Sequence, residues 1–321
     1  MLRKIFDFPA KNLALAIPAI LAVGFVCGYY IDTSVLKSII LPMTFLMIYP
    51  TMIGFSIKEA YNLSHIKVLV FSLILNFLVI PMIAYLLGMA MLYDQPEMLA
   101  GLVLASLLPT SGMTISWTMI FKGNVPAAIK MTAVGLVVGS LLAPWYLLVM
   151  VGKIVPINMG QLFLTISVVV FLPLILGNLT YRAITRKVNP KEFQAKVKPL
   201  LPSFSIWAML IIIFSSISMK SRMIISTPEL IVKGVVVLVL FYAVNFIIST
   251  FTGRIFFKKE NAIALVYGTV MRNLSISLGV ALAAFGVKAG LIVTLAFILQ
   301  VQMAAWYGKL AEKRGFFEHQ N

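Results

Sequence analysis

Apolar runs of membrane-spanning length follow one another along almost the whole chain. Ten runs of about 20 residues, the length that crosses a bilayer as a helix, are separated by short polar segments. They lie at approximately 12–30, 36–56, 67–91, 98–121, 126–150, 159–181, 200–219, 229–253, 261–285 and 289–309. The pattern therefore predicts an all-α membrane protein with ten transmembrane helices.

The composition agrees with this pattern and excludes a soluble globular protein. Of the 321 residues, 61% are hydrophobic and only 11% are charged, whereas soluble domains carry roughly 25% charged residues. The net charge of +16 does not indicate a nucleic-acid-binding surface. The basic residues lie in short loops beside the apolar runs, as orientation signals do, so we expect a lipid bilayer and no nucleic acid among the partners.

The basic residues also predict the orientation of the chain. With ten spans both termini lie on one side, and the loops of that side hold 19 Lys and Arg residues against 6 on the other. The positive-inside rule then places both termini in the cytoplasm of a multi-pass plasma (inner) membrane protein. This bias alone explains the basic loop 182–199. The basic start and first apolar run have no small-residue cleavage site, so we interpret them as the first span.

The two halves of the chain resemble each other. Glu97 to Gly123 aligns without a gap with Glu260 to Gly286, and Asn76 and Asn245 lie in matching apolar contexts. Five spans in each half mean that the second half enters the membrane from the opposite face. We therefore expect two inverted repeats, residues 1–155 and 156–321. Inverted repeats recur in secondary transporters, where the substrate site lies near the midplane.

The alignment places Pro109 and Thr110, in the middle of one span, opposite Arg272 and Asn273 in another. A proline in a helix removes a backbone donor, so we expect a kink or break at Pro109. Interrupted helices at matching positions indicate a transporter site, and their N-terminal ends favour anions. The alternative is that Pro109 only kinks a packed helix.

The polar residues around these two positions are the candidate substrate-binding residues. For Asn76 and Asn245 the alternative is an amide that only joins neighbouring helices. The candidates are Thr110, Ser111, Thr114, Arg272, Asn273, Ser275, Asn76 and Asn245.

Arg272 carries a charge inside an uncharged apolar run. Such a residue costs roughly 2.5–3.5 kcal/mol on insertion scales and needs a partner. All ten acidic residues fall at or beyond the edges of the apolar runs, so no carboxylate inside a span pairs with it. The remaining partners are water, backbone carbonyls or an anionic ligand. A guanidinium suits a carboxylate or oxyanion; the alternative is a structural arginine that caps the carbonyls of a broken helix.

Other function classes find little support. One cysteine, Cys27, and two histidines, His65 and His319, leave no multi-cysteine metal site and no embedded pair for nucleophilic or acid–base chemistry. We expect no enzyme activity, no cofactor and no bound metal. An ion channel is the alternative of another class, but it needs a polar stripe through consecutive spans, whereas polar residues here concentrate at the two interruptions.

The motifs around the first interruption resemble those of the bile acid:sodium symporter superfamily, and the resemblance covers essentially the whole chain. The segment from Pro109 to Thr114 is similar to the family's break in helix 4, and Gly123-Asn124-Val125 is similar to its turn into span 5. The resemblance implies ten spans in a five-plus-five inverted repeat. It implies a core domain of spans 3–5 and 8–10, in which broken helices 4 and 9 cross, and a panel domain of spans 1, 2, 6 and 7. It also implies transport of a small solute by alternating access.

Within the superfamily the chain resembles the arsenite-efflux permeases. Thr110, Met113 and Trp117 have the spacing of a cysteine, a methionine and a tryptophan in that branch. Efflux of arsenite or a related metalloid is therefore an alternative function. Thr110 weakens it, because a hydroxyl forms no sulfur–arsenic bond.

The chain departs from the superfamily at the positions that bind ions. Gly268 and the pair Arg272-Asn273 stand where the symporters have a sodium-binding glutamate and a Gln-Asn pair, and Gln300 replaces a glutamate of the arsenite branch. Thr114 and Thr132 remain as possible ligands. We therefore predict sodium-independent transport of a small organic anion or oxyanion, with Arg272 acting as a tethered cation or receiving the substrate. Substrate identity, direction, any coupling ion and oligomeric state stay open.

Overall fold

The computed structural model describes residues 6–9, 12–54, 65–219, 221–226 and 228–317. His319 and the basic residues of the extreme N-terminus lie outside this part. The described residues form helices, together with one isolated antiparallel bridge between Pro109 and Arg272. The prediction of an all-helical protein is therefore confirmed for the described part of the chain.

The helices of the first half follow the predicted apolar runs closely. They are α2 (Leu13–Tyr30), η1 (Ser34–Leu36), α3 (Lys37–Met52), α4 (Ile66–Ile74), η3 (Leu75–Val79), α5 (Ile80–Met91), α6 (Pro96–Leu107), α7 (Gly112–Ile120) and α8 (Val125–Val151).

The second half begins at Met159. It contains α9 (Met159–Ile166), η4 (Ser167–Phe171), α10 (Leu172–Thr185), α11 (Pro190–Glu192), η5 (Phe193–Val197), η6 (Lys198–Leu200), α12 (Leu201–Ser218), α13 (Ser221–Ser226), α14 (Glu229–Phe256), α15 (Lys259–Val270), α16 (Leu274–Ala284) and α17 (Val287–Lys313).

Seven helical segments of the described residues are long and apolar enough to cross a membrane. Three further apolar helices are shorter: Leu15–Tyr30, Pro96–Leu107 and Leu274–Ala284. The runs expected as single spans at 98–121 and 261–285 are each divided into two short helices, α6 with α7 and α15 with α16. The first division coincides with Pro109, as the missing backbone donor of proline predicts.

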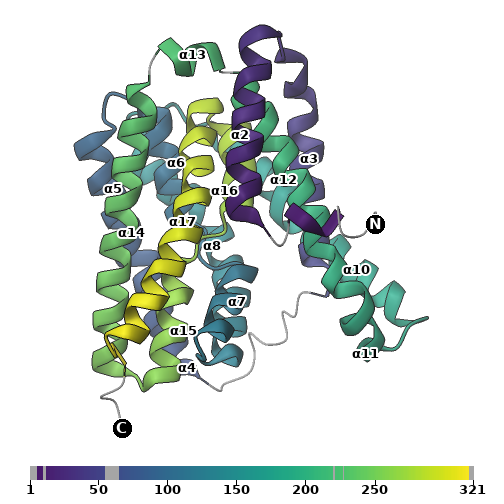
Figure 1. Cartoon of the computed structure of the whole chain (residues 1–321), viewed down its shortest axis with the longest axis vertical. Coiled ribbons are helices and arrows are strands. Elements are labelled where there is room, and N and C mark those ends of the chain that lie inside the picture. The colour runs from purple at the N-terminus through teal and green to yellow at the C-terminus, as the bar shows by residue number, and fades with distance from the viewer. Residues whose placement is uncertain (1–5, 10–11, 55–64, 220, 227, 318–321) are drawn as a thin grey trace.

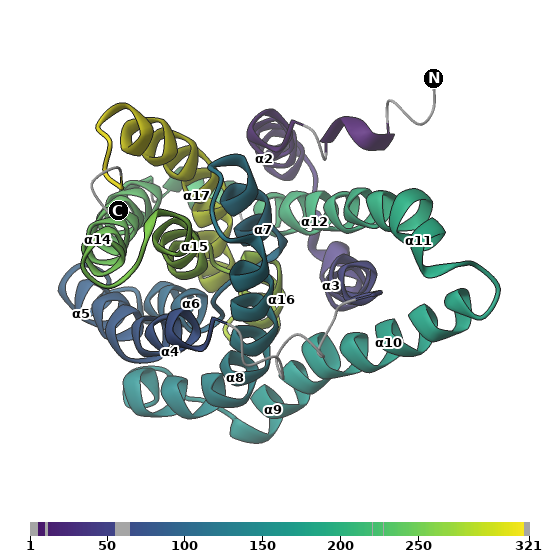
Figure 2. The ribbon, with the colours of Figure 1, turned by 90° about the horizontal axis from the view of Figure 1, so that it is seen from below.

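The helices form two groups, which Figures 1 and 2 show side by side. In one group α12 packs on α2 and α3, α10 packs on α3, and η4 connects α9 to α10. The other group contains α4 to α8 and α14 to α17, with α6 in contact with α5, α8 and α17. The two groups meet mainly where α16 contacts α3 and α9, and where α17 contacts α2 and α12.

The contact between α3 and α16 is close because it combines a small residue with a buried threonine. A Cβ atom built on Gly279 would lie 2.1 Å from Thr44 Cγ2 and 3.3 Å from Thr44 Cβ. Thr44 is buried, and its hydroxyl donates to Ile40 O at 2.8 Å. The absence of a side chain at Gly279 therefore lets the two helix groups touch here.

Widened π-helical turns, which the apolar pattern does not predict, occur at Leu75–Val79, Ser167–Phe171 and Phe193–Val197. Each ends two residues before a proline, Pro81, Pro173 or Pro199. Pro81 has no N–H, so the carbonyl of Phe77, four residues earlier, loses its helical donor. The hydroxyl of Tyr146 in α8 donates to that carbonyl instead. A long-range side chain thus satisfies the group that the proline leaves free.

Candidate functional site

The two interrupted helices cross each other at their breaks. An antiparallel bridge joins Pro109 to Arg272. Its two hydrogen bonds run from Thr110 N to Met271 O and from Asn273 N to Leu108 O, each 2.8 Å long. Neither bond needs the missing N–H of Pro109, so a proline is tolerated at the centre of the crossing. The bridge joins the residues that the alignment of the two halves places opposite each other.

Side chains next to the breaks cap the helices that begin there. Ser111 Oγ accepts from Met113 N and Thr114 Oγ1 accepts from Ser111 N, both at 3.2 Å. These reciprocal bonds stabilise the first turn of α7. At α16, Asn273 Oδ1 accepts from Ile276 N at 3.4 Å. Ser111, Thr114 and Asn273, three of the predicted site residues, therefore accept hydrogen bonds at the starts of helices. Ser275 is half-buried in the first turn of α16.

Thr110 occupies the left-handed region of backbone space, with a φ of 62°. Its hydroxyl donates to Pro109 O at 2.6 Å, and only 1% of the residue is exposed. The glycines of α8 let that helix approach the break. A Cβ on Gly135 would lie 3.2 Å from Thr110 Oγ1, and one on Gly139 would lie 2.7 Å from Leu107 O.

The guanidinium of Arg272 lies between the ends of α6 and α15. Nη1 donates to Ser106 O at 3.0 Å, and Nη2 donates to Thr269 O. Both acceptors belong to the last turn of their helix, where unpaired carbonyls carry a partial negative charge. Arg272 is 1% exposed, so the cation is sequestered from solvent and neutralises two helix ends at once.

Gln300 in α17 fixes the backbone of Arg272 from the other side. Its Oε1 accepts from Arg272 N at 2.7 Å, and its Nε2 donates to Arg272 O at 3.3 Å. The hydroxyl of Tyr242 in α14 donates to the same Oε1 at 3.2 Å. An amide suits this role because it both donates and accepts, whereas the glutamate of the arsenite branch would only accept.

The residues at the predicted ion-site remnants make other contacts in this structure. A side chain at Gly268 would meet Met131 Cε at 2.7 Å, and the Thr132 hydroxyl donates to Ala128 O at 2.8 Å. The guanidinium of Arg272 already uses the carbonyls of Ser106 and Thr269. Among the described residues no group of three or more His, Cys, Asp or Glu side chains is arranged to hold a metal.

The two predicted asparagines have different surroundings. Asn76 Nδ2 donates to Gly268 O at 3.1 Å and to Ser72 Oγ at 3.0 Å, which ties α4 and η3 to α15. Asn245 is fully buried, and neither atom of its amide bonds to another described residue. One turn further along α14, Ser249 Oγ lies 2.6 Å from Thr269 Oγ1.

A buried polar cluster therefore surrounds the C-terminal end of α15. Tyr242, Asn245 and Ser249 follow one another at helical spacing on one face of α14. The first contacts Gln300 and the last contacts Thr269, which places Asn245 between them. Arg272 Nε is also without a bond to a described residue. The guanidinium of Arg272 and several amide and hydroxyl groups are thus buried next to one another in an otherwise apolar part of the protein.

Sequence reasoning missed Tyr242, Ser249 and Thr269. Hydroxyl and aromatic residues are common in membrane helices and carry no signal by themselves. The signal available was spacing, because Tyr242 and Ser249 each lie one turn from Asn245, on either side of it and on the same helix face.

The chain is similar in sequence to known proteins. The chain is 25% identical over 261 residues to the uncharacterized protein YbaS of Bacillus subtilis, covering 79% of this chain and 81% of that protein. It is 26% identical over 227 residues to the arsenical-resistance protein Acr3 of Corynebacterium glutamicum, covering 67% and 61%. It is 20% identical over 219 residues to the uncharacterized sodium-dependent transporter YocS of Bacillus subtilis, covering 67% and 64%. The match thus spans less than two thirds of the latter two proteins.

The resemblance seen in the sequence is confirmed by a family model. The model described as the Sodium Bile acid symporter family matches residues 41–227, more than half of the chain. The matched region contains the first break and its capping residues. The chain therefore belongs to the Sodium Bile acid symporter family.

Proposed function

We propose that this protein is a secondary transporter that moves a small organic anion or oxyanion across the plasma (inner) membrane by alternating access, without sodium. The observation that carries the proposal is the buried guanidinium of Arg272 on the carbonyls of Ser106 and Thr269. It is a permanent cation built into the chain, at a crossing of two broken helices. Membership in a symporter family supports transport as the general function.

The proposed architecture is ten spans in two inverted repeats, residues 1–155 and 156–321, with both termini in the cytoplasm. Three observations support it. The broken helices lie at matching places of the two halves, the bridge between Pro109 and Arg272 joins matched positions, and the helices pack in two groups. In this proposal spans 3–5 and 8–10 form the core domain, and spans 1, 2, 6 and 7 form the panel domain.

The guanidinium removes the need for a sodium ion at the crossing. A cation between two helix C-termini offsets the charge of their free carbonyls. In this chain Arg272 supplies that cation, and Gly268 supplies no carboxylate to hold a second one. Because Arg272 is 1% exposed and its Nη atoms bond to carbonyls, we propose that it substitutes for the ion and that the substrate binds beside it.

The N-terminus of α7 is the proposed place for the anion. Gly112, its first residue, is exposed, and a Cβ atom there would meet nothing within 4 Å. The first amides of a helix point outward and attract negative charge. Ser111 and Asn273 begin the two helices that start at the crossing. A carboxylate or oxyanion approaching Gly112 therefore meets two positive helix ends.

The arrangement of the two helix groups suits alternating access. They touch mainly through α16, whereas α7 packs chiefly on α8 and α15 of its own group. Gly112, Ser116 and Met119 of α7 are exposed. The α16 side of the crossing is thus covered by the other helix group. The α7 side is not covered, as expected for a transporter state that is open to one side of the membrane.

Transport in proteoliposomes tests the proposal. Small carboxylates, sulfate and arsenate are first ranked by the thermal shift they give the purified protein, and flux of the best ligand is then measured. We expect equal initial rates in sodium and in N-methylglucamine buffers. Arg272→Gln lowers the rate at least a hundredfold, whereas Arg314→Gln, which removes an exposed arginine, leaves it unchanged. A rate that needs a sodium gradient, or that survives Arg272→Gln, contradicts the proposal.

Efflux of arsenite is the second candidate, because the relative Acr3 is named for arsenical resistance. The buried hydroxyl of Thr110 bonds to its own backbone, and no cysteine lies near it. We expect the protein not to protect an arsenite-sensitive bacterial host. Protection of the host by the native chain supports metalloid efflux as the function. Protection by the Thr110→Cys variant but not by the native chain supports transport of an anion by the native chain. An ion channel would instead give unitary currents in planar bilayers.

A further inference from the structure

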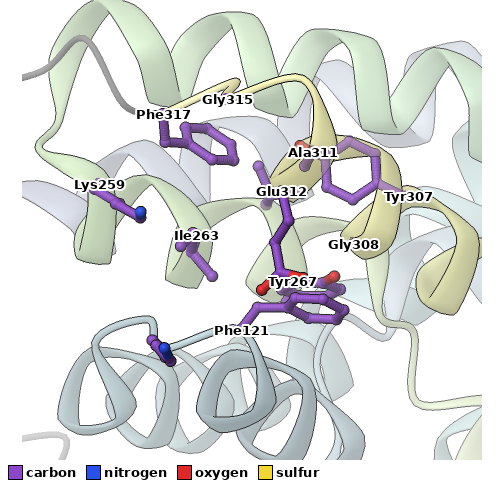
Figure 3. A pocket seen from close by; sticks show the side chains of 12 residues that line it. Phe121, Lys259, Ile263, Tyr267, Tyr307, Gly308, Ala311, Glu312, Gly315 and Phe317 are labelled. Carbon is purple, nitrogen blue, oxygen red and sulfur yellow. The ribbon is translucent and has the colours of Figure 1, made fainter.

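A cavity of about 270 Å³ lies apart from the crossing, where α7 ends, α15 begins and α17 ends (Figure 3). Its lining contains neither Pro109 nor Arg272. The residues that matter for its chemistry are Phe121, Lys122, Lys259, Tyr267, Tyr307 and Glu312. The cavity combines aromatic rings with charges of both signs.

One wall of the cavity is aromatic. The rings of Phe121 and Tyr267 are nearly parallel, with centroids 5.6 Å apart, and the ring of Tyr307 stands almost perpendicular to Tyr267 at 6.3 Å. Phe121 lies against the backbone of α17, since a Cβ on Gly308 would be 2.0 Å from its Cζ. Tyr267 is 1% exposed, and one face of Tyr307 stacks on Phe246 with centroids 4.3 Å apart. Phe121 and Tyr307 are half-buried, so they are the rings that a ligand in the cavity can contact.

The three charges are available for a ligand. Lys122 and Lys259 come from the ends of α7 and α15, and Glu312 extends from α17 toward Tyr267 (Figure 3). The ion pairs found among the described residues join Lys196 to Glu192 and Lys233 to Asp94, so none involves this cavity. A ligand with one positive and one negative group would satisfy all three.

Lys122 is held in a backbone conformation that lysine disfavours, with a φ of 58°. It follows the last turn of α7, which closes through bonds from Lys122 N to Met119 O at 3.1 Å and from Gly123 N to Thr118 O at 2.7 Å. Glycine is the usual residue at this position. Strained residues of this kind cluster at ligand-binding sites, which indicates that the side chain has a use in the cavity.

We propose that this cavity is a binding site for a small zwitterion with an alkylated ammonium and a carboxylate. The ammonium lies beside Glu312 and the half-buried rings of Phe121 and Tyr307, because aromatic rings attract alkylated cations. The carboxylate faces Lys122 and Lys259 through charge-assisted hydrogen bonds. The site does not depend on the proposed transport of an anion at the crossing.

Calorimetric titration of the purified full-length protein tests the site, with glycine betaine as the probe. Its two halves, tetramethylammonium and acetate, are titrated separately. We expect betaine to bind at least tenfold more tightly than either half. Glu312→Gln and Lys259→Gln each weaken betaine binding at least tenfold, and Lys153→Gln, an exposed lysine outside the cavity, leaves it unchanged.

Two further variants separate binding from folding. Lys122→Gly removes the charge and relieves the backbone, so it weakens betaine binding while the thermal unfolding midpoint stays equal or rises. Gly308→Ala displaces Phe121 and weakens binding without changing any charge. Arg272→Gln keeps betaine binding, so a failure of the transport proposal is distinguishable from a failure here. Equal affinity for betaine and either half, or betaine binding unaffected by Glu312→Gln and Lys259→Gln, overturns the inference.

Discussion

At the scale of single residues, Arg272 shows how a membrane protein accommodates a cation without a carboxylate. The insertion cost of roughly 2.5–3.5 kcal/mol is offset by two hydrogen bonds from a charged donor, each contributing about 1.5–3 kcal/mol. Both bonds end on helix C-terminal carbonyls, those of Ser106 and Thr269. The sequence alone predicted the need for such partners, and carbonyls were among the alternatives. It could not identify them, because a carbonyl carries no residue-specific signal.

A substitution at Asn245 can separate the effect of this residue on protein stability from its effect on transport. Its amide bonds to no other described residue, so Asn245→Leu removes a buried polar group at almost constant volume. We expect the free energy of unfolding in detergent to stay equal or rise by about 1–2 kcal/mol, while transport falls at least tenfold. Asn76→Leu is the matched control. It breaks bonds to Gly268 and Ser72 and should lower stability by about 1–3 kcal/mol. Destabilisation by Asn245→Leu instead assigns that amide a structural role.

Because the family resemblance implies sodium binding, two substitutions can test whether a sodium site can be restored in this chain. The double variant Gly268→Glu with Arg272→Gln restores the carboxylate and the amide that the family resemblance implies for sodium binding. Met131, which a side chain at position 268 would meet, is flexible enough to move. We expect sodium chloride to raise the thermal unfolding midpoint of the double variant but not of the native protein, relative to equal potassium chloride. An equal response of both proteins contradicts the role given to Arg272.

At the scale of elements, the helix boundaries were largely predictable and the irregular turns were not. Apolar runs located the helices, and Pro109 located the first break. The break at Arg272 was predicted only through the match between the halves. The widened turn at Leu75–Val79 has the same apolar character as a regular helix. It depends on Pro81 together with a hydroxyl from α8, a partner far away in the sequence.

That hydroxyl belongs to Tyr146, which donates to Phe77 O. Tyr146→Phe leaves the carbonyl without its donor, next to a proline that cannot supply one. We expect a loss of about 1–3 kcal/mol in the free energy of unfolding, measured by denaturant titration in mixed micelles. Tyr85→Phe in α5, where no hydrogen bond of the hydroxyl is found among the described residues, should be neutral. If the two variants lose equal stability, the bond to Phe77 is not the cause.

At the scale of the whole molecule, the contact between the helix groups is the feature that the sequence revealed least. The resemblance of the sequence to a known superfamily implied a core and a panel. The residues that join the groups, Thr44 and Gly279, have no motif, because a small residue opposite a threonine matters only once the two helices are placed. The fold class was therefore predictable from pattern, whereas the state of the transporter was not.

Linking the two groups should stop the transport cycle. The Cβ-to-Cβ separation of 3.3 Å between Thr44 and a side chain built on Gly279 is close to that of disulfides, about 3.5–4.5 Å. We expect Thr44→Cys with Gly279→Cys, in a Cys27→Ser background, to form a disulfide that abolishes flux in proteoliposomes. Dithiothreitol restores the flux of the oxidised double variant. Oxidation leaves the flux of the single-cysteine variants unchanged. Full transport by the oxidised double variant shows that these helices need not separate.

The bridge between Pro109 and Arg272 has a consequence for how such proteins diversify. Its two hydrogen bonds join main-chain atoms, and nearly every amino acid supplies those atoms. Side chains at the crossing can therefore be exchanged while the crossing itself persists. If the proposed function holds, point substitutions at Gly268, Arg272 or Gln300 change which ion or cargo is held without requiring a new backbone. One scaffold can in this way pass between ion-coupled and uncoupled descendants over evolutionary time.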